Sequence, residues 1–258
     1  MAQANSRRAI LKLLLGAPLL VATGRWVQAA APRRLADLIE QTKSIVPISQ
    51  RIDAISRALL GTRYVAHTLI GGPRRQEIFV TRDDAFDCVT YNEFVLAAAR
   101  ARDVPEFETA LRTIRYHGGE VTWRERNHYF ADWSRNNVAN GVCQPVELDG
   151  TTKLDKSSNT EVGLGRRSWT LDAIPQATLQ ASAAKLLAGD IVGFVSRRAN
   201  LDYSHTGFVA FGRYGELLLR HASSTRRRVI DEPMARFIAA NSVKYVSVLR
   251  PQQPRNSA

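Results

Sequence analysis

The pattern of apolar and polar positions changes along this chain of 258 residues. Between Arg33 and Leu60, apolar residues recur at helical spacing, and Pro47 divides the stretch into two predicted helices. From Leu186 onward, short apolar runs are separated by turn residues, which is typical of strands. Helical segments therefore precede a β-rich final third, and this order favours an α+β fold.

Four strands are predicted in the final third, over residues 190–195, 204–211, 216–222 and 243–249. The turn at Gly212–Gly215 joins the second and third of these strands as a hairpin. A helix from Pro233 to Ala240 precedes the last strand, because proline is tolerated in the first turn of a helix. Further upstream, a short strand over 77–80 leads into another predicted helix.

The start of that upstream helix carries the most informative residues, Phe86-Asp87-Cys88-Val89-Thr90. Asp87 is a good N-cap, so Cys88 is expected on the first helical turn. The unpaired N–H groups and the helix dipole at this place favour a thiolate, which predicts a lowered thiol pKa. Cys88 is therefore the candidate nucleophile of a cysteine hydrolase.

Two histidines lie on opposite arms of the predicted hairpin, and the loop length decides whether they share a face. A three-residue loop over Arg213–Gly215, with Gly215 in the left-handed position, puts His205 and His221 diagonally on one face. We therefore expect His205 to be the general base and acid for the cysteine. His221 is expected to bind the far ring nitrogen of His205 and fix its tautomer.

Residues 103–185 show less regular patterning and are interpreted as a large insertion that shapes a substrate groove. Polar and aromatic side chains crowd within 124–133, where they could line that groove or form a mixed surface helix. The candidate substrate-binding residues are Tyr64, Asp87, His128, Tyr129, Asp132 and Trp133.

The first 29 residues have the features of a signal peptide. An Arg7-Arg8 pair precedes an apolar run that is too short for a permanent membrane anchor, and Val27-Gln28-Ala29 suits signal peptidase. The arginine pair resembles a twin-arginine export signal. We therefore expect cleavage near Ala30 and a periplasmic or otherwise exported monomer, with a single catalytic domain over 30–258.

The net charge limits the class of partner. The whole chain carries +12, and four basic residues but no acidic residue lie within 1–29, so the remainder carries +8. A basic protein outside the cytoplasm is expected to meet anionic cell wall, lipid head groups or polysaccharide. Basic residues interleaved with aromatic ones are not found, and nucleic acid is therefore not an expected partner.

Three other interpretations of these residues remain open. Cys88 and Cys143 are the only two cysteines and could form a disulfide in an exported protein. Cys88, His205 and His221 could instead hold a catalytic zinc ion, although no closely spaced ligand pair marks such a site, and no metal or cofactor is expected. The chain could also be a non-catalytic module that binds cell wall through its positive charge.

The arrangement resembles the NlpC-type cell-wall peptidases, which are papain-like, with a cysteine at a helix start and two polar residues on successive strands. The matching motifs are Phe86-Asp87-Cys88, Ser204-His205-Thr206-Gly207 and His221-Ala222-Ser223. More closely, the chain resembles the N-acetylmuramoyl-L-alanine amidase-like family. The stretches that carry this likeness are Leu60-Gly61-Thr62-Arg63-Tyr64, Phe86-Asp87-Cys88-Val89-Thr90-Tyr91, Arg126-Asn127-His128-Tyr129 with Asp132-Trp133, and Gly189-Asp190-Ile191-Val192.

This resemblance implies a papain-like NlpC-type fold, in which the nucleophile helix packs on an antiparallel sheet. It also implies cleavage of an amide bond in peptidoglycan or a muropeptide, and it favours the bond between the sugar and L-alanine. A bond within the stem peptide is the alternative. Val89 stands where many NlpC-type enzymes have serine, so an oxyanion hole would depend on backbone N–H groups.

Overall fold

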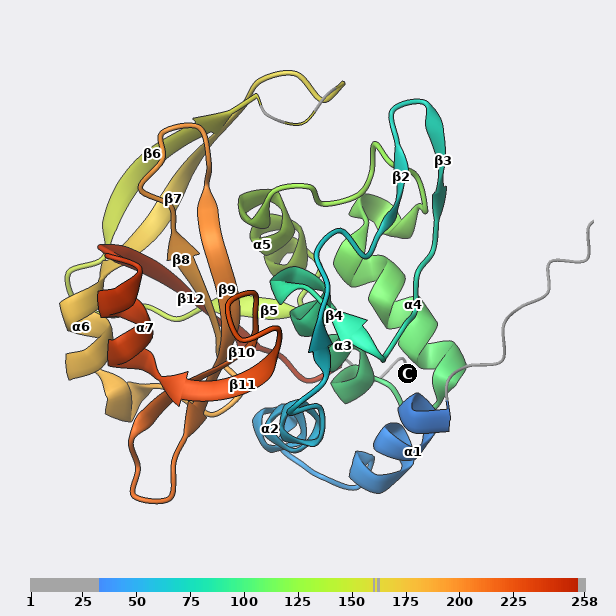
Figure 1. The fold of residues 1–258 in the computed structure, drawn as a ribbon, viewed down its shortest axis with the longest axis horizontal. Helices are drawn as coiled ribbons and strands as arrows, with labels where there is room; N and C mark the ends of the chain where they lie inside the picture. Colours follow the sequence, from blue (N-terminus) through green and yellow to red (C-terminus); the bar gives the residue numbers. More distant parts are fainter. Residues whose placement is uncertain (1–32, 160, 162, 255–258) are drawn as a thin grey trace, which may run out of the picture. The chain divides into compact units, whose positions relative to one another are not determined.

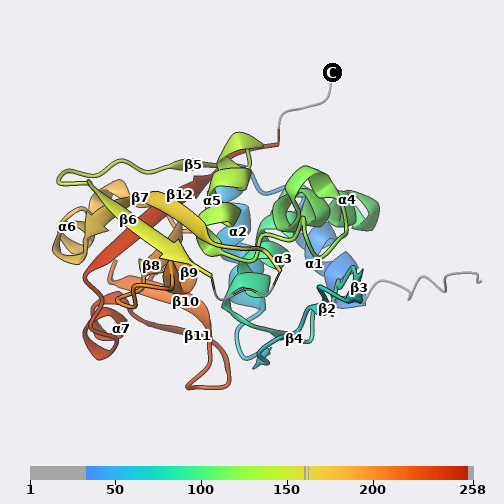
Figure 2. The same ribbon diagram turned by 90° about the horizontal axis from the view of Figure 1, so that it is seen from above.

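A curled, mostly antiparallel sheet separates two groups of helices in the computed structural model, which describes residues 33–159, 161 and 163–254. Helices α1 to α5 lie on one side of the sheet, and α6 and α7 lie on the other (Figure 1). Figure 2 shows the same division from above. The helices are α1 (Arg33–Thr42), α2 (Ile48–Ala58), α3 (Cys88–Arg100), α4 (Val104–Arg115), α5 (Phe130–Ala139), α6 (Gln176–Ala181) and α7 (Met234–Ala240).

The strands run in the order β4-β1-β11-β10-β9-β8-β12-β7-β6, and β5 pairs with β12 beside this path. Strand β1 pairs with β4 in parallel, and β2 and β3 form a separate hairpin. The strands are β1 (Arg63–Tyr64), β2 (Ile70–Gly72), β3 (Arg75–Ile78), β4 (Ala85–Phe86), β5 (Cys143–Pro145), β6 (Thr152–Ser158), β7 (Arg167–Pro175), β8 (Ile191–Val195), β9 (Tyr203–Phe211), β10 (Leu217–Ser223), β11 (Arg228–Pro233) and β12 (Tyr245–Pro251).

The α+β class is confirmed, as are the helices on either side of Pro47. Residues 103–185 are more regular than their sequence predicted. Helix α4 packs on α3 within the main core, and β7 pairs with β12, so this segment is built into the sheet and its helical layer. The predicted signal peptide at 1–29 lies outside the described residues.

Helix α3 is the centre of the larger core. Every residue from Thr90 to Ala99 is buried, because α3 is enclosed by α1, α2, α4 and strand β9. The ring of Tyr91 packs edge-on against Phe208 of β9, with centroids 5.7 Å apart. Burial of such side chains contributes about 1.5–3 kcal/mol each, so α3 is held mainly by packing rather than by its helix propensity.

A buried arginine connects this helical layer to the sheet. The Arg220 guanidinium donates to Asp231 on β11 at 2.7 Å and to Asp53 on α2 at 2.7 Å. It also donates to the hydroxyl of Ser56 at 3.0 Å. Because Arg220 is only 1% exposed, these acceptors compensate for the water that its charge has lost.

The hairpin of β9 and β10 has the predicted three-residue loop. Phe211 pairs with Leu217, and the Gly212 N–H donates to the carbonyl of Glu216 at 3.0 Å, so residues 213–215 form the loop. Gly215 has a φ of +82°, the left-handed conformation that glycine adopts without strain. This odd loop length is the condition under which His205 and His221 share a face.

All of the described residues belong to one compact unit. Within this part of the chain, no helix combines the length and apolar character needed to cross a bilayer.

The contact at Gly193 on β8 yields a stability prediction. A Cβ atom at this position would lie 2.6 Å from Phe130 Cε1 and 2.8 Å from Tyr203 Cε1. We expect Gly193→Ala to lower the free energy of unfolding by about 1–3 kcal/mol through overpacking. Urea denaturation checks this. Gly72→Ala is the control, because its Cβ would meet no atom closer than 3.7 Å; equal stability of the two variants would contradict the prediction.

Candidate active site

The predicted Asp87 cap is confirmed, and it forms a capping box with Thr90 that fixes the first turn of α3. The Asp87 carboxylate accepts hydrogen bonds from the backbone N–H groups of Val89 at 3.1 Å and Thr90 at 2.8 Å. In return, the Asp87 N–H donates to the Thr90 hydroxyl at 2.9 Å. These reciprocal bonds satisfy donors that the helix leaves unpaired, and they fix the position of Cys88.

The Cys88 thiol lies against strand β9, at the residue that follows His205. The backbone N–H groups of Thr206, Cys88 and Val89 all favour the thiolate form. Strand β9 is held at this point by Asn92 of α3, whose amide donates to the Thr206 hydroxyl at 2.8 Å. The helix that carries Cys88 and the strand that carries His205 are therefore joined by a buried hydrogen bond.

The predicted lowering of the thiol pKa is wrong. Burial and, secondarily, the negative charge of Asp87 raise the pKa of Cys88 to about 12, despite the opposing N–H groups. The helix dipole acts over only the first turn, where the capping carboxylate offsets it. This shift favours the protonated thiol at a residue that is itself half-buried.

His205 and His221 share a face, as the loop parity predicted. The Nε2 atom of His205 lies 2.6 Å from Nδ1 of His221, so the two rings are joined by a hydrogen bond. The Nε2 atom of His221 lies 2.7 Å from Oε1 of Glu232 on strand β11. A row of three polar side chains thus crosses three adjacent strands, and Nδ1 is the nitrogen of His205 that His221 does not engage.

One aromatic ring of α7, that of Phe237, packs against both histidines. The Phe237 ring lies 5.2 Å from His205 and 5.4 Å from His221, measured between centroids. The absence of a side chain at Gly207 leaves room for His221, because a Cβ atom at position 207 would lie 2.8 Å from the His221 Cβ. Burial and the neighbouring His221 lower the pKa of His205 to about 3, so its imidazole is neutral near pH 7.

Of the predicted substrate-binding residues, Tyr64 and Asp87 lie near the thiol. Burial raises the pKa of Tyr64, and the proximity of Cys88 and Asp87 raises it further. The Asp87 carboxylate accepts hydrogen bonds from the first N–H groups of α3, so it caps the helix. A contact of Tyr64 or Asp87 with substrate stays a prediction.

The other four predicted groove residues support the fold, and for two of them burial corrects the expectation. Trp133 is fully buried against Phe130, and Tyr129 is 4% exposed and packs on Trp169. Asp132 accepts a hydrogen bond from the Trp169 indole at 2.7 Å. The fourth residue, His128, binds a backbone carbonyl.

The His128 interaction explains its placement. Its Nε2 lies 2.6 Å from the carbonyl oxygen of Trp123, and the two rings are 4.5 Å apart. Burial, the largest cause, lowers the pKa of His128. In this segment the apolar residues pack in the core, and the polar residues bind β7 or a loop. This mixture of residue types is also typical of a groove lining, which explains the sequence-based expectation.

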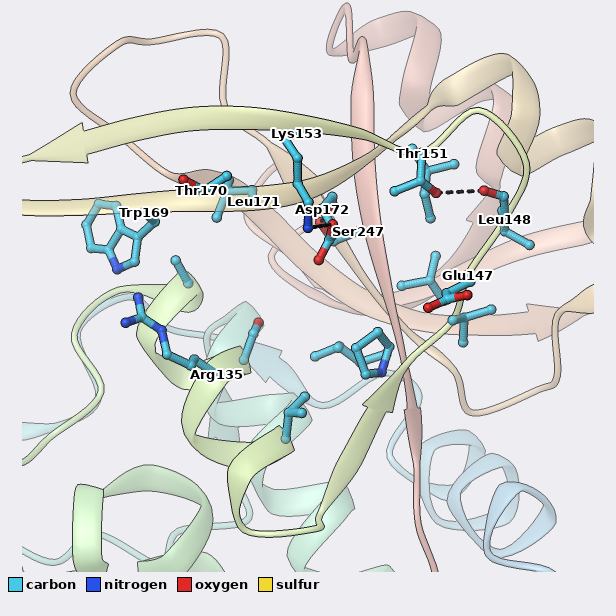
Figure 3. Close-up of a pocket in the computed structure, with 18 of the residues that line it drawn as sticks. Arg135, Glu147, Leu148, Thr151, Lys153, Trp169, Thr170, Leu171, Asp172 and Ser247 are labelled. Atoms are coloured by element: carbon cyan, nitrogen blue, oxygen red, sulfur yellow. Dashed lines mark hydrogen bonds and ion pairs between the residues drawn. The ribbon is translucent and has the colours of Figure 1, made fainter.

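A cavity of about 660 Å³ lies elsewhere, between α5 and strands β6, β7 and β12. Figure 3 shows Lys153 paired with Asp172 on one side of it, with Trp169 and Arg135 on another. Most of its lining comes from 131–174, within the segment that was expected to shape a groove. Cys88, His205 and His221 do not line this cavity.

Two alternatives from the sequence do not fit the geometry. Cys88 and Cys143 are both free thiols, and Cys143 is buried on β5, so they form no disulfide. His205 Nε2 and His221 Nδ1 bond each other, and His221 Nε2 bonds Glu232, so these nitrogens do not converge on a common metal position. Among the described residues, no group of three histidine, cysteine, aspartate or glutamate side chains is arranged to hold a metal ion.

The model of a protein family described as N-acetylmuramoyl-L-alanine amidase-like matches residues 54–244. The chain belongs to this family. Its matched region contains both the capped Cys88 turn and the two histidines. The family that the sequence resemblance indicated is thereby confirmed, whereas the papain-like NlpC description stays a proposal.

Two solved structures are similar to this amidase-like chain. One is a crystal structure of an N-acetylmuramoyl-L-alanine amidase from Bacteroides uniformis, with 26% identity, a TM-score of 0.70, and coverage of 80% of this chain and 99% of that chain. The other is a Legionella pneumophila protein with 22% identity, a TM-score of 0.75, and coverage of 86% and 95%. The second likeness shows the fold alone. The comparison with curated proteins found no match.

Sequence reasoning missed Glu232 in this amidase-like site. Glu232 lies two residues from Ile230, which pairs with His221, so it is diagonal to His221 on the neighbouring strand. The available signal was the alternation of side chains between the two faces of the strand over 228–233. This strand follows the His221 strand after a short turn, so every second residue faces the same side as His221. The buried Asp202 has a different role, because its carboxylate accepts from the Ala131 N–H at 2.7 Å in the first turn of α5.

The capping box predicts two different effects at Asp87. Asp87→Ala removes the cap and should destabilise the protein by about 1 kcal/mol. Asp87→Asn keeps a capping oxygen but removes the charge that raises the thiol pKa, so it should retain stability and lower that pKa. Thermal unfolding and the pH dependence of thiol alkylation measure these effects. An unchanged alkylation profile in Asp87→Asn would contradict the electrostatic explanation.

The lowered pKa of His205 predicts how its contribution to stability depends on pH. Between its ordinary value of 6.5 and its folded value of about 3, the unfolded chain binds more protons than the folded chain. Stability from this group is therefore complete above pH 6.5 and is lost as the pH falls toward 3. Urea denaturation should show a smaller loss over this range for His205→Gln than for the wild type. Parallel curves would refute the linkage.

Proposed function

We propose that this protein is a cysteine amidase that hydrolyses the amide bond between N-acetylmuramic acid and L-alanine in peptidoglycan. The observation that carries this proposal is the 2.6 Å hydrogen bond between His205 and His221, beside the strand residue that contacts Cys88. A nucleophile, a base and an orienting group are then present in one place. Cys88, His205 and His221 take these three roles.

The charge states favour general-base catalysis over a preformed thiolate. A thiol with a raised pKa and an imidazole with a lowered pKa are both neutral at rest. As the sulfur attacks the amide carbonyl, Nδ1 of His205 takes the thiol proton. Charge then develops on the imidazole and on the carbonyl oxygen together, so the site is charged mainly during the reaction.

The tetrahedral intermediate collapses when the carbon–nitrogen bond breaks. His205 returns its proton to the departing amine of L-alanine, and the lactyl carbonyl of the sugar remains as a thioester on Cys88. Water then attacks the thioester while His205 accepts a proton, which releases a carboxylate and restores the thiol. Because the Asp87 carboxylate accepts from the N–H groups of Val89 and Thr90, the backbone N–H of Cys88 is the first-turn donor left for the oxyanion.

The choice of bond is supported by the family and by the Bacteroides uniformis amidase, which shares 26% identity. A positively charged protein also suits an anionic polymer. The same chemistry would cleave an amide within the stem peptide, which is the alternative substrate bond. The papain-like description is part of this proposal, because the cysteine helix, histidine strand and third residue follow that order.

Export to the periplasm is proposed from residues 1–29 alone. Their basic start, apolar run and small residues match a signal peptide, and the arginine pair favours the twin-arginine route. Export would bring the enzyme to its polymer. We further propose that the enzyme acts as a monomer and has no permanent membrane anchor.

Cys88→Ala tests the nucleophile. We expect hydrolysis of purified peptidoglycan to fall by at least about 10⁴-fold, because the covalent step is lost, while thermal stability changes little. Cys143→Ser is the matched control, since Cys143 lies on β5, which pairs with β12 and not with the histidine strands β9 and β10. Turnover measured on folded protein should stay near wild type in this control. Wild-type rates in Cys88→Ala would remove Cys88 from the mechanism.

Mass spectrometry of the released fragments identifies the bond in the same experiment. Amidase action releases stem peptides with a free amino-terminal alanine and leaves glycan chains intact. Peptide fragments that begin at an internal residue would instead assign the enzyme to the stem-peptide alternative. Intact polymer with the wild-type enzyme would leave only wall binding, and pull-down with peptidoglycan would then measure that activity.

A further inference from the structure

The Glu232 carboxylate is the last member of the polar row across the sheet. Its Oε1 lies 2.7 Å from His221 Nε2, while the His221 side chain is 2% exposed and that of Glu232 is 23% exposed. Strand pairing sets this contact, because His221 lies opposite Ile230 and Glu232 is the diagonal neighbour on the same face. Glu232 therefore reaches water on one side and a buried imidazole on the other.

We propose that Glu232 is a positioning residue that selects the tautomers of His221 and His205, so that His205 presents an unprotonated Nδ1 to Cys88. The proposal rests on the proposed cysteine amidase mechanism and extends it by one residue. Glu232 contacts neither Cys88 nor a substrate, and its effect passes through His221.

The hydrogen-bond chain determines each proton in turn. An ionised carboxylate only accepts, so Nε2 of His221 must carry the proton that it donates to Glu232. A neutral His221 then has a bare Nδ1, which accepts from Nε2–H of His205. A neutral His205 with its proton on Nε2 has its lone pair on Nδ1. That nitrogen can take the thiol proton.

The charge of Glu232 also favours the transition state. When His205 takes a proton from Cys88, its Nε2–H bond to His221 strengthens, and the positive charge spreads toward Glu232. The hydrogen bond and charge of Glu232 raise the His221 pKa against the dominant effect of burial, and Asp231 adds a smaller effect.

The other neighbours of the histidines supply little competing charge. Asp231 is paired with Arg220 on the opposite face of the sheet. His205 approaches from β9, and α7 presents the apolar ring of Phe237. Glu232 is therefore the acceptor that orients His221 among the described residues that contact it.

Glu232→Ala and Glu232→Gln test this proposal, with Glu216→Ala as the matched control. Glu216 lies in the β9–β10 hairpin that carries both histidines, but it is exposed at the loop, where it accepts from the Tyr214 N–H. In Glu232→Ala we expect kcat to fall by about 10- to 100-fold with little change in KM. Loss of a residue that orients a metal-binding histidine has an effect of this size in metalloenzymes. Glu232→Gln keeps an acceptor oxygen and should recover part of this loss.

The acidic limb of the kcat profile should also move to lower pH in Glu232→Ala, because a charge that favours the imidazolium is gone. A structural role would lower the melting temperature but leave this limb and the tautomers in place. Unchanged kcat and pH profile in Glu232→Ala, with an active wild type, would overturn the proposal.

Nitrogen-15 NMR of the histidine rings tests the tautomers without any substrate. The wild type should show Nε2–H on both His205 and His221, and Glu232→Ala should show a mixture with Nδ1–H. The same tautomers in both proteins would overturn the proposal. Because this measurement needs no turnover, it distinguishes failure of the Glu232 proposal from failure of the proposed amidase function.

Discussion

The capped first turn of α3 is the constraint on which the site depends. Helix α3 is buried from Thr90 to Ala99, and like every helix it leaves its first N–H groups without a partner inside the helix. Asp87 and Thr90 satisfy them within the chain. This cap holds Cys88 against Thr206 of β9. One helical turn later, the Asn92 amide donates a second hydrogen bond to the same strand, at the Thr206 hydroxyl. Cys88, the proposed nucleophile, therefore takes its position from the core.

The same burial gives the site its electrostatic character. Loss of water disfavours both a thiolate on Cys88 and an imidazolium on His205, and it therefore favours the neutral form of each group. The groups that offset this cost, Glu232 and the backbone N–H groups, lie where charge develops during the proposed reaction. Such an arrangement stabilises a charged transition state more than a charged resting state, which is what catalysis requires.

The segment over 124–133 shows how a chemical signal can belong to the scaffold. Tyr129 and Trp133 fill the core, while Asp132 binds the Trp169 indole and thereby ties α5 to β7. The large cavity beside α5 is lined by these same elements. Their polar and aromatic mixture thus reflects a junction between a helix and two long strands. The segment therefore supports the fold beside this cavity and does not form the surface around the Cys88 thiol.

The sequence by itself determined the helices around Pro47, the Asp87 cap and the hairpin loop that puts His205 and His221 on one face. These features depend on residues close together in the chain, such as Gly215 in its left-handed turn. Only the tertiary structure decided the raised pKa of the Cys88 thiol, because desolvation comes from residues distant in sequence. It also decided the contact of Glu232 with His221, since the register of β10 and β11 sets which carboxylate reaches the ring. Local patterns specify conformation, whereas charge states and long-range partners depend on how the whole chain packs.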